Sequence, residues 1–167
     1  MSGIACSKTT TLVALLTALL LSGCGYRLAG TADLPPELST LHLVTRDFSD
    51  AQARALERKL TNAGAQLVEQ AGADAVTLSV SLGVEPDRQL ISSASSGTTV
   101  NRLSRSLDFS LSGADGAALT PPQTLRQQVD IELDDDNLLA SNREKETAIQ
   151  QLEQRLYQQL IRQLSSI

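Results

Sequence analysis

Apolar and polar residues alternate along three segments in the second half of the chain. In residues 75–84, 99–111 and 124–134 most alternate side chains are Val, Leu, Ile or Phe, separated by Ser, Thr, Gln, Asp or Arg. A period of two places the apolar side chains on one face of a β-strand. Arg105 is the exception, because it stands on the apolar face of its strand. The Ser-rich stretch 92–97 predicts a hairpin turn, so we expect an antiparallel meander.

Two other segments have helical spacing. Apolar residues recur every three or four positions in residues 51–64, where Gly64 provides a stop, and more strongly in residues 137–164. A short β-rich segment, 41–45, precedes the first helix, and residues 71–75 are too short for a further element. Each helix has one apolar stripe, and the apolar face of the sheet has to be buried against other elements. The pattern therefore predicts an α+β two-layer sandwich, a four-stranded mixed sheet with two helices packed on one face in the order β-α-β-β-β-α.

The N-terminus has the pattern of a processing signal. Lys8 precedes an apolar run at residues 12–21, about half of the roughly 20 residues that a membrane-spanning helix needs. Leu21-Ser22-Gly23-Cys24 then resembles the bacterial lipobox, which implies cleavage before Cys24, a thioether-linked lipid on its sulfur and acylation of its new amine. The alternative is an ordinary secretory signal. We predict a removed signal peptide at 1–23, a lipidated tether at 24–37 and one domain at 38–167.

Composition narrows the classes of function. The 14 basic and 19 acidic residues give a formal net charge of −5, and aromatic residues make up 2% of the chain. The charge argues against nucleic acid as a partner, since phosphate neutralisation needs surplus basic charge. The few aromatic rings argue against stacking platforms for bases or sugars. Cys6 lies in the predicted signal peptide and Cys24 is the predicted lipid site. No disulfide is therefore expected in the mature chain.

The residues offer little for catalysis or metal binding. His42 is the only histidine, and no phosphate-binding loop, His-x-x-x-His pair or nucleophile elbow occurs. The acidic run at 132–137 lacks the alternate spacing of a calcium loop, and acidic residues are also favoured at the start of a helix. We therefore predict no enzyme activity, no catalytic residue, no metal and no cofactor.

Arginines near the predicted hairpin are the better candidates for binding. Arg88, Arg102 and Arg105 flank the Ser-rich turn. Guanidinium groups form paired hydrogen bonds with phosphates and carboxylates, so a cluster of them could hold an anionic ligand. The alternative is ordinary solvated surface charge.

Several stretches, in this order, resemble the LptE family of lipopolysaccharide-assembly lipoproteins. They are LSGCGYRLAG with the early LPPEL, then NRLSRSLDFSL with a following Gly turn and LTPPQTL, and finally LYQQLIRQLSSI. The resemblance implies two helices on a four-stranded sheet. It also implies a non-catalytic protein that plugs the outer-membrane β-barrel LptD, helps it to assemble, and binds lipopolysaccharide during delivery to the outer leaflet.

The same resemblance implies where the protein and its binding residues lie. Gly25 follows the predicted lipid site in place of the Asp that retains such lipoproteins in the inner membrane, which points to the periplasmic side of the outer membrane. Family members have basic residues near the hairpin and at the start of the last helix, so Arg143 and Lys145 join the candidates for lipopolysaccharide binding. Here the hairpin tip itself has no charge. The alternative function is a lipoprotein of another envelope or secretion assembly without lipopolysaccharide binding.

Overall fold

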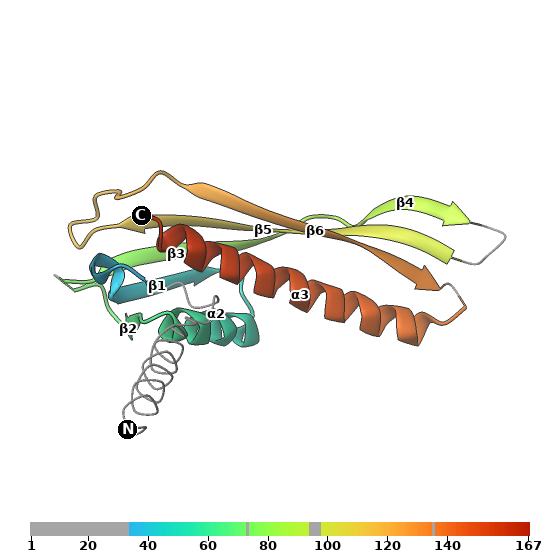
Figure 1. The fold of residues 1–167 in the computed structure, drawn as a ribbon, viewed down its shortest axis with the longest axis horizontal. Helices are drawn as coiled ribbons and strands as arrows, with labels where there is room; N and C mark the ends of the chain where they lie inside the picture. Colours follow the sequence, from blue (N-terminus) through green and yellow to red (C-terminus); the bar gives the residue numbers. More distant parts are fainter. Residues whose placement is uncertain (1–33, 73, 94–97, 135) are drawn as a thin grey trace, which may run out of the picture. The chain divides into compact units, whose positions relative to one another are not determined.

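The computed structural model describes residues 34–72, 74–93, 98–134 and 136–167, which belong to one unit of the chain, Thr31–Ile167. The predicted signal peptide, Cys24 and most of the predicted tether lie outside the described residues, as do residues 94–97 of the hairpin tip. The elements shown in Figure 1 are η1 (Pro36–Leu38), β1 (Thr40–Arg46), α2 (Asp50–Asn62), β2 (Gln66–Val68), β3 (Val76–Val84), β4 (Arg88–Ser93), β5 (Thr98–Ser112), β6 (Gln123–Asp134) and α3 (Leu138–Leu164).

The sheet is mixed and has six strands, so the prediction of four strands is wrong. Its order is β2-β1-β3-β5-β4, and β6 also pairs with β5. Strand β1 runs parallel to β2 and β3, whereas β5 runs antiparallel to β3, β4 and β6. The predicted meander is present as β3-β5-β6. The two strands that the sequence did not predict are β2 and β4.

Both additional strands depend on pairing across the sheet. Strand β2 has three residues, too few to show a period, and is defined by its parallel register with β1. Strands β3 and β4 pair one after the other with the same edge of β5. Pairing of β3 ends at Val84↔Arg105, and pairing of β4 begins at Arg88↔Arg102. Pro86 lies in the gap and lacks the N–H that a continuous ladder needs. The same edge of β5 is therefore paired with two separate strands, β3 and β4, and not with one long strand.

Helix α2 has defined signals at both ends. The Ser49 side chain accepts from the backbone N–H of Gln52, and the Gln52 side chain accepts from the backbone N–H of Ser49, which together form a capping box. At the other end Gly64 has a φ of +95°, the left-handed conformation that favours glycine. Helix α3 begins after Asn137, whose side chain caps the backbone N–H of Ala140.

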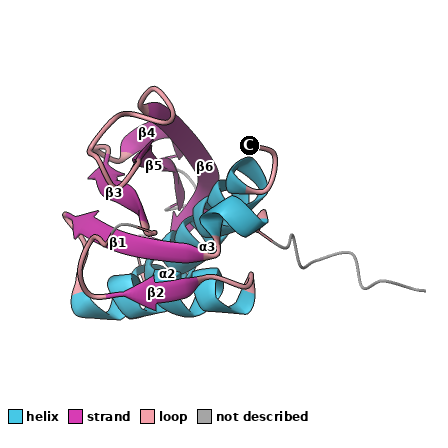
Figure 2. Ribbon diagram, turned by 90° about the vertical axis from the view of Figure 1, so that its left-hand side faces the viewer, coloured by secondary structure: helices cyan, strands magenta, loops and turns pink. Residues whose placement is uncertain are grey.

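Two apolar clusters join both helices to one face of the sheet. The larger cluster combines residues of β1, β3 and β5 with α2 and the C-terminal half of α3, and the smaller one lies between β5, β6 and the middle of α3. Members of the larger cluster include Leu41, Leu56, Leu60, Leu78, Leu107, Phe109, Leu156 and Leu160; the smaller one contains Leu103, Ile131, Ala148 and Leu152. In Figure 2, α2 lies below β1 and α3 lies beside β6. No helix in the described part of the chain has both the length and the apolar character needed to cross a bilayer.

The opposite side of the sheet, called here the outer face, is polar where β3, β5 and β6 pair, while Val100 and the exposed Ile91 lie on it beside β4. Because side chains alternate along a strand, burial of Leu103, Leu107 and Phe109 against the helices turns the side chains of Arg102, Ser104 and Ser106 to the outer face. Register adds Arg126, Gln128 and Asp130 from β6 beside them. Neither apolar cluster includes a residue of the outer face, so this polar surface is available to a partner.

Candidate functional site

Two of the predicted arginines meet on the outer face. Arg88 of β4 and Arg102 of β5 are directly opposite in the register, and Arg102 is opposite Asp130 of β6. Arg102 donates from Nε and Nη2 to the two carboxylate oxygens of Asp130, at 2.7 and 2.8 Å. This fork-like hydrogen bonding raises the pKa of Arg102 and lowers the pKa of Asp130, with charge attraction adding to both shifts. Arg88 is exposed and has no ion pair with another described residue.

Arg105 lies on the other side of the same strand. It is only 7% exposed, and its Nη1 donates to the backbone carbonyl oxygen of Ser104 at 2.8 Å. In sequence it stands between Leu103 of the smaller apolar cluster and Leu107 of the larger one. The alternation placed Arg105 on the apolar face of its strand, and its side chain is indeed buried there. A ligand on the protein surface does not reach this guanidinium, in contrast to those of Arg88 and Arg102.

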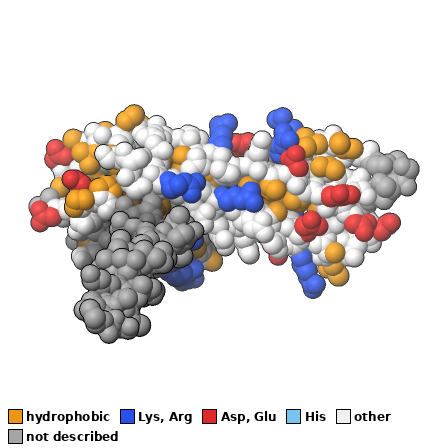
Figure 3. Space-filling view, in the orientation of Figure 1, with side chains coloured by type: hydrophobic (Ala, Val, Ile, Leu, Met, Phe, Trp, Pro, Cys, Tyr) orange, Lys and Arg blue, Asp and Glu red, His pale blue; other side chains and the backbone are white. Residues whose placement is uncertain are grey.

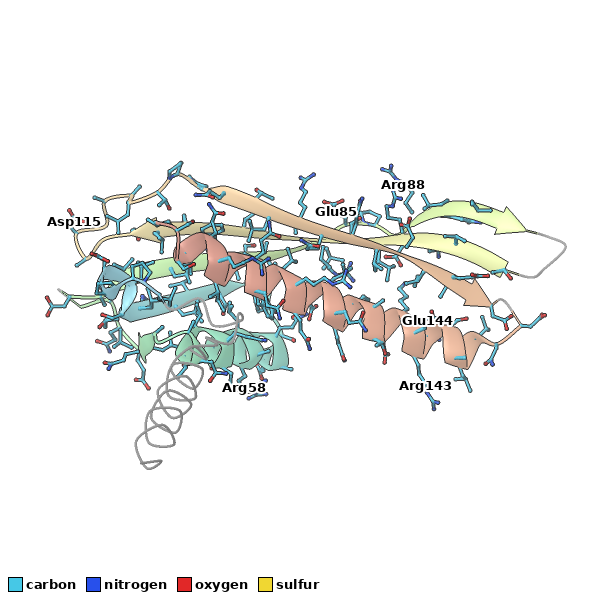
Figure 4. All side chains as sticks on the ribbon, in the orientation of Figure 1. Arg58, Glu85, Arg88, Asp115, Arg143 and Glu144 are labelled. Atoms are coloured by element: carbon cyan, nitrogen blue, oxygen red, sulfur yellow. The ribbon has the colours of Figure 1, made fainter. Side chains whose placement is uncertain are left out.

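The two candidates on α3 are separate from the outer face. Lys145 forms an ion pair with Asp87 in the gap between β3 and β4. Arg143 points away from the sheet, on the opposite side of the fold from Arg88 (Figure 4). In the face shown in Figure 3, basic side chains lie mainly over the middle of the domain and acidic ones mainly toward its two ends. The structure thus brings together Arg88 and Arg102 and leaves the other predicted residues apart.

The outer face also has a pocket that the sequence did not predict. It is lined by Glu85, Ser104, Arg126, Gln127 and Gln128, with a volume of about 420 Å³. We call it the outer-face pocket. Arg126 Nε lies 3.8 Å from Glu85 Oε1, and the Arg126 side chain is 73% exposed. The lining residues lie on two strands and in the loop after a third, so no local motif marks them.

Polar side chains are also buried at the contact between helices α2 and α3. Glu153 of α3 is 8% exposed and accepts a hydrogen bond of 2.6 Å from Gln52 Nε2 of α2. One turn further along α3, the hydroxyl of Tyr157 is buried and has no hydrogen-bond partner within the described part of the chain; the same holds for Nδ1 of His42. Burial, and then the charge of Glu153, raise the pKa of Tyr157. Among the described residues, no group of three or more His, Cys, Asp or Glu side chains is placed to hold a metal ion.

Comparison with known proteins decides the family. The model of the LptE family, described as lipopolysaccharide-assembly, matches residues 38–164. The chain belongs to the LptE family. The match covers α2, α3 and the six strands of the described residues, so the resemblance noted in the sequence is confirmed over residues 38–164.

Individual relatives agree with this assignment. The chain is 27% identical over 163 residues to the LPS-assembly lipoprotein LptE of Photorhabdus laumondii, covering 96% of this chain and 87% of that protein. The fold is similar to that of lipoprotein B from Nitrosomonas europaea (TM-score 0.68, 22% identity, 85% of this chain and 91% of that one). It is also similar to a minor lipoprotein from Acinetobacter baumannii (TM-score 0.61, 24% identity, 77% and 92%).

Membership of the LptE family implies a lipoprotein of the outer membrane with a role in lipopolysaccharide assembly together with LptD. The family acts in assembly and not in catalysis. The residues that carry this role are consequently expected on surfaces that meet a partner or a ligand. On this fold the polar outer face, with Arg88 and Arg102, is the leading candidate surface.

Proposed function

We propose that this chain is anchored through lipid on Cys24 to the periplasmic side of the outer membrane, where it forms the plug of an LptD barrel, helps that barrel to assemble and binds lipopolysaccharide. The match of the LptE family to residues 38–164 is the observation that carries this proposal. The predicted tether, residues 24–37, links the lipid to the domain.

The outer face supports the role of a plug. A protein inside a barrel meets a lumen that is polar and filled with water, in contrast to the lipid-facing wall. The outer face presents Ser, Thr, Gln and paired charges, and the helices bury the apolar face of the same sheet. A two-layer domain with one polar sheet face can therefore lie in such a lumen without exposing its core.

Arg88 and Arg102 are the proposed contacts for the anionic groups of lipopolysaccharide. Arg88 is exposed and unpaired within the described residues, and Arg102 is held in a fixed orientation by Asp130. Guanidinium groups hold phosphate by charge-assisted hydrogen bonds. Arg143 and Lys145 are two separate candidate contacts on α3, and Lys145 is paired with Asp87. Arg105 has no direct part, because its side chain is buried.

Affinity purification from detergent-solubilised outer membranes tests the barrel and the anchor. The full chain, tagged at its C-terminus, should retain a large β-barrel protein identified by mass spectrometry as LptD. Cys24→Ala should move the chain to the soluble periplasmic fraction, whereas Cys6→Ala, the matched control within the predicted signal peptide, should leave it in the membrane. Recovery of the chain without a barrel would contradict the plug, and membrane retention of Cys24→Ala would contradict the anchor.

Direct binding tests the ligand. The full chain in detergent should bind purified lipopolysaccharide, and replacing both Arg88 and Arg102 by Ala should weaken binding by about tenfold or more, as expected for loss of charged hydrogen bonds. The matched control replaces Arg54 and Arg58, two exposed arginines of α2, by Ala. Absence of binding to the unmodified chain would favour the alternative, a lipoprotein of another envelope assembly.

A further inference from the structure

From the outer-face pocket we infer a second contact for the proposed ligand, a site that takes the uncharged sugar residues of lipopolysaccharide and not its phosphates. This inference rests on the proposed function. The pocket lies on the same face as Arg88 and Arg102, but it is formed by other residues. Its volume of about 420 Å³ is within the range of about 300–1000 Å³ found for small-molecule sites.

Small side chains create the hollow. Ser104 of β5 lies opposite Gln128 of β6, and in the next row Gly83, Ser106 and Arg126 lie side by side across β3, β5 and β6. A Cβ atom at Gly83 would lie 2.2 Å from Ser106 Oγ, so a larger residue does not fit there without displacing that hydroxyl. Small residues of β3 and β5 therefore lie beside the long side chains of Arg126 and Gln128 on β6.

The gap between β3 and β4 opens one side of the pocket. Pairing of β3 with β5 ends at Val84, and Glu85 continues past that point to line the pocket. In Figure 4 Glu85 and Arg88 project on the same side of the fold, away from α3. Because the strand pairing with β5 is interrupted between β3 and β4, Ser104 is left accessible. A continuous neighbouring strand with larger side chains would cover it.

The functional groups of the lining favour a neutral ligand with many hydroxyl groups. Ser104 and Gln128 each offer a donor and an acceptor, Arg126 offers donors, and Glu85 offers acceptors. The Gln127 amide is held elsewhere, since its Nε2 donates to Gln159 Oε1 on α3 at 2.8 Å. No residue of the lining is apolar, and its apolar surface comes from the stems of polar side chains.

Charge separates sugar from phosphate as the occupant. The one guanidinium of the pocket lies beside the one carboxylate, Arg126 Nε 3.8 Å from Glu85 Oε1, so the lining has no surplus positive charge. An anion would be attracted by Arg126 and repelled by Glu85. Hydroxyl groups, which both donate and accept, can bind to both side chains. Binding at the pocket should therefore depend much less on salt than binding of phosphates at Arg88 and Arg102.

The test uses oligosaccharide released from lipopolysaccharide by mild acid and then dephosphorylated and carboxyl-reduced, so that it lacks acyl chains and anionic groups. Its binding to the full chain in detergent is measured by isothermal titration calorimetry. We expect saturable binding whose affinity changes less than about twofold between 50 and 500 mM NaCl. Ser104→Leu, which fills the pocket, and Arg126→Gln, which removes its guanidinium, should each weaken it about tenfold. Ser110→Leu is the control, because Ser110 is on the same face of β5, six positions or about 20 Å away.

Each outcome has a defined meaning. No binding of the oligosaccharide, equal binding by Ser104→Leu and Arg126→Gln, or equal loss in Ser110→Leu would overturn the site. Equal binding of chito-oligosaccharide would overturn the assignment to lipopolysaccharide. Binding of intact lipopolysaccharide without binding of its oligosaccharide would refute the sugar site and leave the proposed function standing. Absence of both would refute the proposed binding of lipopolysaccharide. Should Ser104→Leu fail to fold by circular dichroism, Arg126→Gln decides, because that side chain is 73% exposed.

Discussion

The hydroxyl of Tyr157 is a buried polar group that has no hydrogen-bond partner among the described residues. Tyr157 is 2% exposed, and its ring stacks on Phe48 with 6.3 Å between ring centroids and 19° between planes. Its hydroxyl forms no hydrogen bond with residues 34–72, 74–93, 98–134 or 136–167, and burial, followed by the nearby charge of Glu153, raises the pKa of Tyr157. Replacing Tyr157 by Phe would remove that hydroxyl and keep the ring and its stacking.

We expect Tyr157→Phe to increase the free energy of unfolding. A buried donor or acceptor without a partner costs about 1–3 kcal/mol, and Phe removes the group without creating a cavity. The expected gain at pH 7 is therefore about 1 kcal/mol. Loss of the stacked ring would act in the opposite direction, but the substitution retains the ring.

The same substitution should change the response to alkaline pH. A raised folded-state pKa means that the neutral phenol contributes stability fully below the unfolded pKa of about 10, and this contribution is lost as pH rises from there towards the folded pKa. In that window the wild-type chain should lose up to about 1.4 kcal/mol per pH unit through Tyr157. Tyr157→Phe should lack this part of the loss.

Urea unfolding followed by circular dichroism at pH 7 to 11 measures both effects, with wild type and variant in a common Cys24→Ala background. Equal m values would show that the difference lies in stability and not in the compactness of the denatured state. A decrease of 1 kcal/mol or more at pH 7, or an alkaline loss equal to that of wild type, would refute the assignment of an unpartnered hydroxyl.

Three further predictions concern packing, capping and a surface ion pair. Leu152→Ala should destabilise the chain by about 2–5 kcal/mol in urea unfolding, because Leu152 is fully buried in the smaller apolar cluster; a loss below 1 kcal/mol would contradict that packing. Ser49→Ala should cost about 1 kcal/mol through the α2 capping box, and Ser49→Asp should restore most of it. Hydrogen bonding from Arg102 lowers the pKa of Asp130, so the stability that Asp130 contributes is present above the unfolded pKa of about 3.9 and is lost as pH falls through the folded pKa. Asp130→Asn should therefore flatten the acid dependence of the free energy of unfolding below pH 4. An unchanged profile would count against the ion pair.

Much of the fold was accessible from the sequence because its elements are strongly amphipathic. The period of two in residues 75–84 predicted β3, and the helical spacing in residues 137–164 predicted α3 to within one residue of its start. The same alternation placed Arg105 on the apolar face, where it is indeed buried. Strands β2 and β4 were missed, since β2 has three residues and β4 combines the adjacent Leu90 and Ile91 with a bulge, which removes a regular period.

The candidate site was less accessible than the fold. Arg88, Arg102 and Arg105 are close in sequence around the hairpin, yet Arg105 lies on the opposite face from Arg102, and only the register shows Arg88 beside Arg102. The outer-face pocket had no sequence signal, because Ser104 and Gln128 become neighbours only when β5 and β6 pair.

The sequence by itself determined the apolar faces of the long strands β3, β5 and β6 and of both predicted helices, and its motifs, read in order, indicated the LptE family. Local periodicity is sufficient for this, because the face of a strand or helix depends on nearby residues alone. Tertiary structure decided the number of strands, the pairing of Arg102 with Asp130 and the position of the outer-face pocket. These depend on register between distant segments, where a shift of one residue would turn Arg102 and Ser104 towards the helices and bring Arg105 to the surface.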